Sequence, residues 1–445
     1  MQFQRILVRR HVIALAFGAM VGWSWVLLSG LWIERAGTFG AALAFMLAGA
    51  VMVLIALTYA ELASAMPHTG GEHVYTARAF GDSMSFLCTW ALLLGYVSVV
   101  AFEVVALPFA LSWLFPVLDV GLLWQVAGWD VYASQVAIGI SAAIALTLVN
   151  LRGIGSAARL QGAVTLFIVL AGLLLVGGAL GTGSPRNLEP LFAAGAGGVL
   201  GVVVMVPLMF VGFDVIPQAA EEINLPPERI GALVVASVLC AVAWYVLIIL
   251  AVGWVLDAPA RGQAALPTAE AAAVAWSGQW AAQLLVAGGI AGIVTTWNAF
   301  LVGASRLIYV MGQSGQLPRW IAGDANGDLS RALWAICAVS CLAPWFGRPA
   351  LVWLVDAGSV GVIVAYAVVA LAFLRLRRVE PELPRPYRVR HGVFIGRTAF
   401  VLALAIGALY LPWSPSALVW PQEWLICILW VLLGAGLFHF TRRAP

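Results

Sequence analysis

Two stretches of this chain place glycines beside aromatic, hydroxyl or acidic side chains inside otherwise apolar runs. The first reads Phe-Gly-Ala-Met-Val-Gly-Trp-Ser over residues 17–24, and the second reads Phe-Val-Gly-Phe-Asp over residues 210–214. Glycine lets the backbone unwind and lets a ligand approach it closely. The N–H groups that begin a new half-helix suit a carboxylate, and unpaired carbonyl oxygens suit an ammonium group. The predicted chemistry is therefore recognition of a small molecule that has both charges.

Four carboxylic acids also lie within apolar runs, where an ionised carboxylate is costly and usually marks the path of an ion or a substrate. They are Glu61, Glu103, Asp214 and Asp356. The chain has no lysine, and we expect its arginines in loops or at helix ends. An internal salt bridge to any of the four is therefore not expected, and each should be protonated, hydrogen-bonded or facing a cation.

Glu103 is our candidate for the residue that holds a coupling proton or binds an amine, because it lies two helical turns from Tyr96 on one face of its predicted helix. The alternative is a permanently protonated structural carboxyl. We expect a structural or gating role for Glu61, and we expect Asp214 to cap or hydrogen-bond the interrupted segment. Asp356 has the least support.

The elements that position these residues are predicted to be membrane helices, since 63% of the 445 residues are hydrophobic and only 10% are charged. Apolar stretches of about twenty residues, long enough to cross hydrocarbon, follow one another along almost the whole chain. We predict twelve spans in a single membrane domain over 1–445. They cover 11–34, 40–65, 83–114, 131–150, 160–181, 197–223, 230–256, 278–306, 332–346, 350–374, 393–412 and 421–440.

The arginines orient these spans. Placing both termini in the cytoplasm puts nineteen of the 23 arginines inside and leaves Arg35, Arg186, Arg261 and Arg348 outside. This is the asymmetry that the positive-inside rule predicts. The small net charge of +3 therefore points to anionic lipid headgroups and not to nucleic acid. All five cysteines fall inside predicted spans, which favours packing over a disulfide framework or a metal site.

The two interruptions fall in the first and sixth predicted spans, five helices apart. An odd separation gives the two blocks opposite orientations in the membrane, which predicts an inverted repeat of about 11–181 and about 197–374, with the last two helices at about 393–440 appended. Unwound backbone at membrane depth occurs only where it is buried in protein or lines a cavity. The alternative for Gly18 and Gly22 is a GxxxG packing face on an unbroken helix.

Several segments together resemble the amino acid-polyamine-organocation superfamily of permeases. The resemblance rests on Gly18-Ala-Met-Val-Gly22-Trp-Ser24, on Phe210-Val-Gly-Phe-Asp214 with Ala219-Ala-Glu-Glu222, on Tyr59-Ala-Glu-Leu-Ala63 with Gly70-Gly-Glu72, and on Gly303-Ala-Ser-Arg306. It covers the first ten spans. The resemblance implies an all-helical LeuT-like fold with broken helices 1 and 6, and alternating access to a site between spans 1, 3, 6, 8 and 10.

With this resemblance, the interrupted segments predict the substrate-binding residues Gly18, Met20, Val21, Gly22, Trp23, Ser24, Tyr96, Phe210, Val211, Phe213 and Asp214. Trp23 and Phe213 are candidates for gates or walls of the site, and the carbonyls of Phe210, Val211 and Phe213 are candidate acceptors. Ser24 stands where the family usually has a third glycine, which narrows the approach to the backbone. The expected partners are an amino acid or amine and the lipid bilayer, and the sequence leaves the oligomeric state open.

We expect no cofactor, and energy from a gradient across a cytoplasmic (inner) membrane, because no nucleotide-binding motif is present. Proton symport comes first, with sodium symport and substrate exchange as alternatives. Hydroxyl and amide oxygens for sodium are available at Thr295, Thr296 and Asn298. An ion channel is disfavoured because no filter-like repeat is present, and a membrane enzyme because no nucleophile with an oriented base is present.

Overall fold

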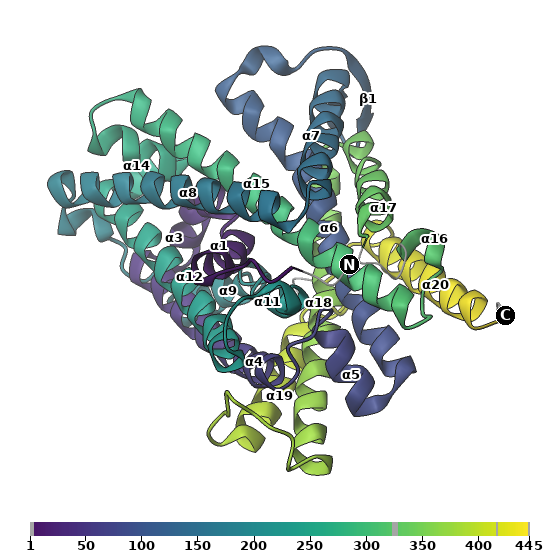
Figure 1. Ribbon diagram of the computed structural model, residues 1–445. Helices are drawn as coiled ribbons and strands as arrows, with labels where there is room; N and C mark the ends of the chain where they lie inside the picture. Colours follow the sequence, from purple (N-terminus) through teal and green to yellow (C-terminus); the bar gives the residue numbers. More distant parts are fainter. Residues whose placement is uncertain (1–3, 323–327, 415–416, 444–445) are drawn as a thin grey trace.

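The computed structural model describes residues 4–322, 328–414 and 417–443, and its regular structure is almost entirely helical (Figure 1). Eight helices in these ranges are long and apolar enough to cross a membrane. They are α4 (Thr38–Ala65), α6 (Asp82–Leu114), α7 (Ala133–Leu151), α8 (Ile154–Thr182), α12 (Pro227–Val255), α15 (Gln279–Gln313), α18 (Pro349–Val379) and α20 (Gln422–Arg443). Two apolar helices are shorter, α17 (Ser330–Ser340) and α19 (Gly392–Ala408).

The first and sixth predicted spans are broken into short pieces, as the sequence predicted. The first consists of α1 (Arg9–Met20), α2 (Ser24–Leu27) and α3 (Ser29–Ala36). The sixth consists of α9 (Gly195–Val203), α10 (Val206–Met209) and α11 (Val215–Gln218). The alternative of an unbroken first helix with a GxxxG face is therefore wrong. The total number of spans and the inverted repeat stay predictions.

A β-hairpin and several short helices lie between the predicted spans. Strands β1 (Leu122–Val126) and β2 (Trp129–Tyr132) pair antiparallel, so the chain is not purely helical. The two residues between them, Ala127 and Gly128, both have positive φ, as in the tight turns that join twisted strands. The short helices are α5 (Glu72–Phe80), α13 (Ala258–Gln263), α14 (Pro267–Ala275) and α16 (Arg319–Ala322).

The broken segments lie toward the middle of the molecule, and longer helices surround them. In Figure 1, α1, α9 and α11 lie centrally, with α4, α6, α8, α15 and α18 around them. Helix α1 packs against α8, α12 and α15, and its residues from Ala14 to Met20 are buried. Proline residues begin the neighbouring helices α12 and α18, where a missing N–H costs no helical hydrogen bond. This packing encloses the unwound backbone in protein.

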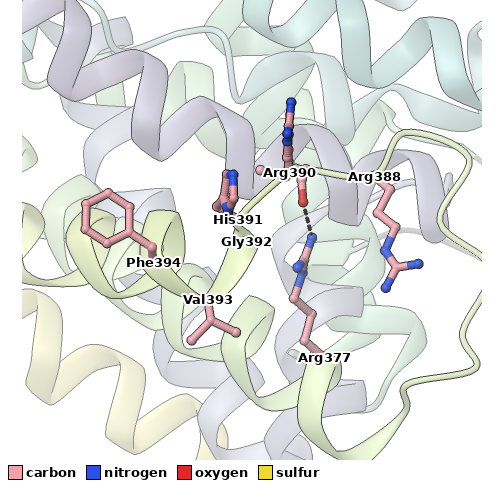
Figure 2. Close-up of a pocket in the computed structure, with 8 residues that line it drawn as sticks. Arg377, Arg388, Arg390, His391, Gly392, Val393 and Phe394 are labelled. Atoms are coloured by element: carbon pink, nitrogen blue, oxygen red, sulfur yellow. Dashed lines mark hydrogen bonds between the residues drawn. The ribbon is translucent and has the colours of Figure 1, made fainter.

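The connection between α18 and α19 forms a cavity of about 540 Å³ that is separate from the broken segments. Figure 2 shows Arg377 from the end of α18, and Arg388 and Arg390 from the connection, around this cavity. Arg377 donates a hydrogen bond of 2.8 Å to the carbonyl of Val389. We call this space the arginine cavity.

Candidate functional site

The break between α1 and α2 leaves backbone donors without helical partners. The N–H of Val21 still donates to the carbonyl of Phe17 at 2.9 Å, which closes the last turn of α1. Across the described residues, the next two N–H groups, those of Gly22 and Trp23, donate to no backbone carbonyl. They are followed at once by the start of α2. These donors have the position and the chemistry predicted for holding a carboxylate.

Tyr245 of α12 bridges the two sides of this break. Its hydroxyl donates to the carbonyl of Met20 at 2.8 Å, and it lies 2.9 Å from the hydroxyl of Ser24. Met20 ends α1 and Ser24 begins α2. Through Tyr245, Ser24 therefore fixes the start of α2 relative to the end of α1 on the side that faces α12.

On its other side the break is held by α15 and α8. Thr296 of α15 donates to the carbonyl of Gly18 at 3.1 Å. Gln161 and Thr165 of α8 donate to the carbonyl of Ala14 at 3.2 and 3.3 Å. These carbonyls lie in the last two turns of α1, so three side chains fix the end of the helix from outside it.

The second break packs directly against the first. Gly212 has φ +132°, a conformation that L side chains rarely adopt. A Cβ atom at Gly212 would lie 2.6 Å from the Cβ of Ala19 and 3.2 Å from the backbone N of Met20. Only glycine lets the two unwound segments approach this closely, so Gly212 brings the two halves of the predicted site together.

Asp214 stabilises the second break, as the sequence predicted. Its Oδ1 accepts the N–H of Gly212 at 2.8 Å, and its Oδ2 accepts the hydroxyl of Tyr96 at 2.8 Å. Tyr96 comes from α6, and its ring packs edge-on against Phe300 of α15 with centroids 4.9 Å apart. Asp214 is fully buried, and both of its oxygens are hydrogen-bonded. Its carboxylate is therefore occupied in shaping the break.

The aromatic residues of the second break are packed into the core. The ring of Phe210 lies edge-on to Tyr245, with centroids 5.9 Å apart, and Phe213 lies between Tyr59 and Tyr366 at 5.4 and 5.6 Å. Both phenylalanines are fully buried. As a gate, Phe213 would have to leave its cluster with Tyr59 and Tyr366.

The backbone of this break differs from the prediction at one position. The carbonyl of Phe213 accepts the N–H of Ile216 at 3.2 Å, so the prediction of an unpaired carbonyl there is wrong. The chain turns directly into α11 after residue 214, and the first turn of that helix uses this oxygen. The carbonyls of Phe210 and Val211 accept no backbone N–H among the described residues. They remain candidate acceptors for an ammonium group.

Two predicted residues of the first break are placed by α15. The indole of Trp23 lies over Gly289 and is only partly buried, whereas Val21 is fully buried. A Cβ atom at Gly292 would lie 3.1 Å from the carbonyl oxygen of Val21. Small residues on α15 thus let the unwound chain lie against that helix.

Glu103 lies beside the first break with one carboxyl oxygen unpaired. It is 2% exposed, and within the described residues its Oε2 has no hydrogen-bond partner. A Cβ atom at Gly22 would lie 3.8 Å from Oε1 of Glu103 and 2.9 Å from the hydroxyl of Thr296. Helix α6 therefore presents Tyr96 to the second break and Glu103 to the first.

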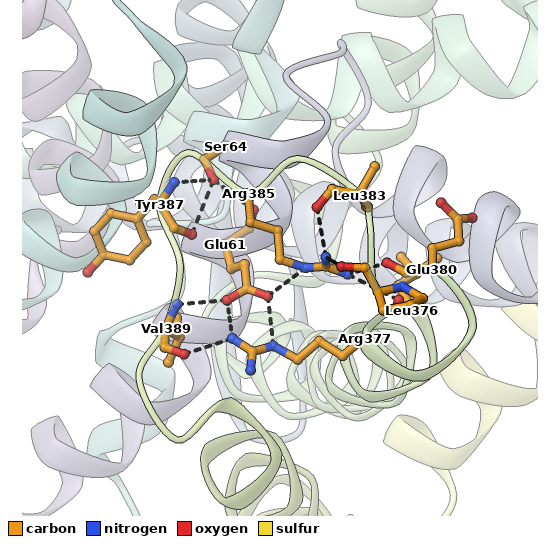
Figure 3. A network of polar contacts seen from close by, with 10 residues as sticks. Glu61, Ser64, Leu376, Arg377, Glu380, Leu383, Arg385, Tyr387 and Val389 are labelled. Atoms are coloured by element: carbon orange, nitrogen blue, oxygen red, sulfur yellow. Dashed lines mark hydrogen bonds and ion pairs between the residues drawn. The ribbon is translucent and has the colours of Figure 1, made fainter.

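Glu61 contradicts the expectation that none of the buried acids forms a salt bridge. It is 1% exposed, and its carboxylate binds two guanidinium groups. Arg377 donates through Nε at 2.8 Å and through a second nitrogen, and Nε of Arg385 lies 3.1 Å from the carboxylate. The N–H of Val389 completes the shell at 2.7 Å (Figure 3). The sequence missed this cluster because both arginines lie more than 300 residues later in the chain.

Two of the three predicted oxygen ligands of α15 form their hydrogen bonds away from the breaks. The hydroxyl of Thr295 donates to the carbonyl of Gly292 in its own helix at 3.0 Å. Asn298 donates to Gln161 at 2.7 Å and accepts from Asn150 at 2.9 Å, so it joins α7, α8 and α15. Among the hydrogen bonds of the described residues, only that of Thr296 reaches the broken helix from this set of three, although the Cβ of Thr295 also lies close to Gly18. Sodium coordination by these residues stays a prediction.

Another buried ion pair joins two segments that the sequence had singled out separately. Arg306 binds Glu222 through two nitrogens, at 2.8 and 3.1 Å, and both side chains are less than 5% exposed. Glu222 follows α11, and Arg306 lies in the second half of α15. The two residues are 84 positions apart, so the sequence alone does not show that they pair. An acidic and a basic residue in two apolar spans nevertheless could have suggested an ion pair inside the protein.

The chain as a whole matches a known family. The family model described as amino acid permease matches residues 9–433, which is nearly the entire chain. The chain belongs to the amino acid permease family. The resemblance to the amino acid-polyamine-organocation superfamily is thereby confirmed, and this permease is an integral membrane protein of a transporter family and not an enzyme.

Curated relatives of the permease are named for different substrates. The chain is 25% identical to the branched-chain amino acid permease BcaP of Bacillus subtilis (strain 168), over 96% of this chain and 91% of the relative. It is 24% identical to the aspartate-proton symporter of the same organism, over 91% and 79%. It is also 24% identical to the lysine-specific permease LysP of Escherichia coli (strain K12), over 84% and 79%.

Proposed function

We propose that the permease takes up amino acids or related amines by proton symport, through a single site that opens alternately to the two sides of the membrane. The observation that carries the proposal is the direct packing of the two breaks, with Glu103 beside them. The free N–H groups of Gly22 and Trp23 suit the carboxylate of an amino acid, and the carbonyls of Phe210 and Val211 suit its ammonium group.

In this proposal Glu103 holds the coupling proton. A buried carboxyl with an unpaired oxygen is costly to ionise. A proton that binds Glu103 together with the substrate removes this charge, and this lowers the free energy of the occupied site. One relative is named an aspartate-proton symporter, and this supports the proposal of proton coupling in the permease. A protonated Glu103 favours neutral amino acids, whereas an ionised Glu103 favours cationic amino acids or amines.

The proposed location is the cytoplasmic (inner) membrane, with both termini in the cytoplasm. The excess of arginines on one side of the twelve predicted spans supports this orientation. The inverted repeat belongs to the same proposal, because it relates the two broken helices by a symmetry that would let the site open to either side.

Uptake into vesicles of purified permease tests the proposal. Labelled amino acids and amines are screened with an imposed proton gradient, with a sodium gradient and with neither. We expect accumulation of at least one amino acid with the proton gradient alone. Accumulation only with sodium would overturn proton coupling, and uptake only against a preloaded substrate would show exchange.

The variant Glu103→Gln tests the proton carrier within the same assay. We expect it to bind substrate, measured by thermal shift, and to lose proton-driven accumulation. Asp356→Asn is the matched control, since Asp356 is another carboxyl within an apolar helix, and it lies near Tyr410 and Glu423, which belong to neither break. If Glu103→Gln leaves both substrate affinity and the pH dependence of uptake unchanged, Glu103 is not the coupling residue.

A further inference from the structure

The arginine cavity at the junction of α18 and α19 has no role in the proposed transport cycle. Its volume of about 540 Å³ is enough for a small charged group with bound water. Three arginines, Arg377, Arg388 and Arg390, contribute to its lining. Val393 and Phe394, from the first turn of α19, complete it on the apolar side.

The cavity has more positive charge than its protein partners neutralise. Arg377 shares the carboxylate of Glu61 with Arg385, so one negative charge already serves two positive ones. Arg388 and Arg390 are exposed, and neither forms an ion pair in the described ranges 4–322, 328–414 and 417–443. Two guanidinium groups therefore remain available at the cavity for an anion.

The start of α19 adds backbone donors to these guanidinium groups. His391, the residue before the helix, has φ +55°, and its side chain makes no capping hydrogen bond. The first N–H groups of a helix have no partner within the helix, and the helix dipole places partial positive charge there. Gly392 leaves room for the guanidinium of Arg377 to lie against this first turn.

The apolar side of the cavity distinguishes its ligand from a free ion. Val393 is 49% exposed and Phe394 is 69% exposed, and both belong to the apolar helix α19, which has one further exposed arginine, Arg397, in its next turn. In the proposed orientation this end of α19 faces the cytoplasmic leaflet, where anionic lipids are common. Charge beside exposed apolar side chains matches an amphiphile with an anionic head.

We propose that the arginine cavity binds the phosphate group of an anionic phospholipid. Arginine is suited to this ligand, because its planar guanidinium donates two parallel hydrogen bonds to phosphate oxygens. The acyl chains would lie along Val393 and Phe394. The proposal concerns a lipid that accompanies the permease, and it holds whichever substrate or coupling ion the transport site uses.

The test measures the thermal midpoint of the purified permease in detergent while a ligand is added. The probes are short-chain phosphatidylglycerol, short-chain phosphatidylcholine and inorganic phosphate at equal ionic strength. We expect a saturable rise with phosphatidylglycerol. In the variant Arg388→Gln/Arg390→Gln we expect the apparent Kd to rise by about tenfold or more, because charge-assisted hydrogen bonds to phosphate are lost.

The control variant Arg159→Gln/Arg229→Gln removes the same charge from exposed arginines that do not line the cavity. Its apparent Kd should stay within about twofold of the wild-type value. All variants are exposed substitutions, and the midpoint without ligand checks that each is folded. Equal effects of the two double variants, or equal affinity for phosphatidylcholine, would overturn the proposal.

A further variant separates a lipid from free phosphate. Phe394→Ser should weaken phosphatidylglycerol binding by about threefold to tenfold, since apolar contact with the acyl chains is lost. It should leave any effect of inorganic phosphate unchanged. If inorganic phosphate stabilises the wild type as strongly as the lipid does, and Phe394→Ser changes neither response, the lipid assignment is wrong.

Discussion

The cluster around Glu61 allows a quantitative prediction, because two buried arginines share the single negative charge of Glu61. Glu61, Arg377 and Arg385 have side chains that are 1%, 16% and 7% exposed. The substitution Glu61→Gln keeps the shape of the side chain and removes its charge. Both guanidinium groups then stay buried without a counter-ion, and the N–H of Val389 loses a charged acceptor.

The expected cost follows from this geometry. Removing one partner of a buried ion pair costs about 3–5 kcal/mol, because the remaining charge is left uncompensated. One kcal/mol shifts the unfolding midpoint by about 2–4 °C in domains of 150–250 residues, and by less in a longer chain. The entropy of unfolding is about 2.1 cal/mol/K per residue, so for the 445 residues of this permease we expect the thermal midpoint of Glu61→Gln to fall by about 3–5 °C.

A double-mutant cycle tests the cause and not only the size of the effect. If uncompensated charge dominates, the double variant Glu61→Gln/Arg377→Gln should be less destabilised than the sum of its single variants, by about 1–3 kcal/mol. The matched control is Glu380→Gln at the pair of Glu380 with Arg78, which are 31% and 46% exposed. An exposed pair contributes less than about 1 kcal/mol.

Two results would refute this reasoning. The first is a midpoint for Glu61→Gln that falls no further than the midpoint of Glu380→Gln. The second is strict additivity in the cycle, which would mean that Glu61 and Arg377 act independently. Either result would show that water reaches the cluster shown in Figure 3 and screens its charges.

Three further predictions concern single residues. Tyr245→Phe removes the hydroxyl that bridges the first break and leaves the buried carbonyl of Met20 unpaired. We therefore expect the free energy of unfolding to fall by about 1–3 kcal/mol and uptake to be slower. Ser24→Ala should have a smaller effect, because Tyr245 still binds the Met20 carbonyl. Gly212→Ala forces a Cβ atom against the first break and should lower the free energy of unfolding by at least about 2 kcal/mol. The control Gly195→Ala is also at positive φ but has open space around it, so it should lower this free energy by less. Equal thermal midpoints for the two variants would contradict this prediction. Burial lowers the pKa of His73, in α5, from 6.5 to about 4. The unfolded chain therefore binds more protons between these values, and stability should fall by about 2 kcal/mol as pH drops from about 7.5 to about 5; a His73→Gln variant with the same acid sensitivity would disprove this origin.

The broken helices were predictable from sequence because their signal is local. Glycines and an acid interrupt apolar runs at residues 17–24 and 210–214, and the backbone unwinds in both places. The hydrogen bond from Gly212 to Asp214 spans only two residues, so it too follows from the local pattern. Local sequence therefore identifies where the backbone opens.

The partners of these breaks were not predictable, because each comes from a distant segment. Tyr245 lies 225 residues after the Met20 carbonyl that it binds, and in sequence it looks like any tyrosine of an apolar span. The guanidinium of Arg377 lies 316 residues after Glu61. Residue type shows that a buried hydroxyl or carboxylate needs a partner, but only the packing of helices shows which partner it has.

Residue type also could not show which side of a helix faces the breaks. Thr295 and Thr296 are adjacent on α15, so they point in directions about 100° apart. Thr296 binds the carbonyl of Gly18, and Thr295 binds its own helix. A choice between the two needs the rotation of α15 about its axis, which depends on how closely α1 approaches its small residues.

The position of Tyr96 and Glu103 on one helix connects the two breaks physically. Tyr96 holds the second break through Asp214, and Glu103 lies beside Gly22 in the first. A shift of α1 relative to α6 that lets water reach Gly22 would also change the surroundings of the Glu103 carboxyl, while Tyr96 could keep the second break in place. If Glu103 holds the proton, opening the site and releasing the proton are therefore linked through the distance between α1 and α6, and Tyr96→Phe should loosen that link without removing the proton site.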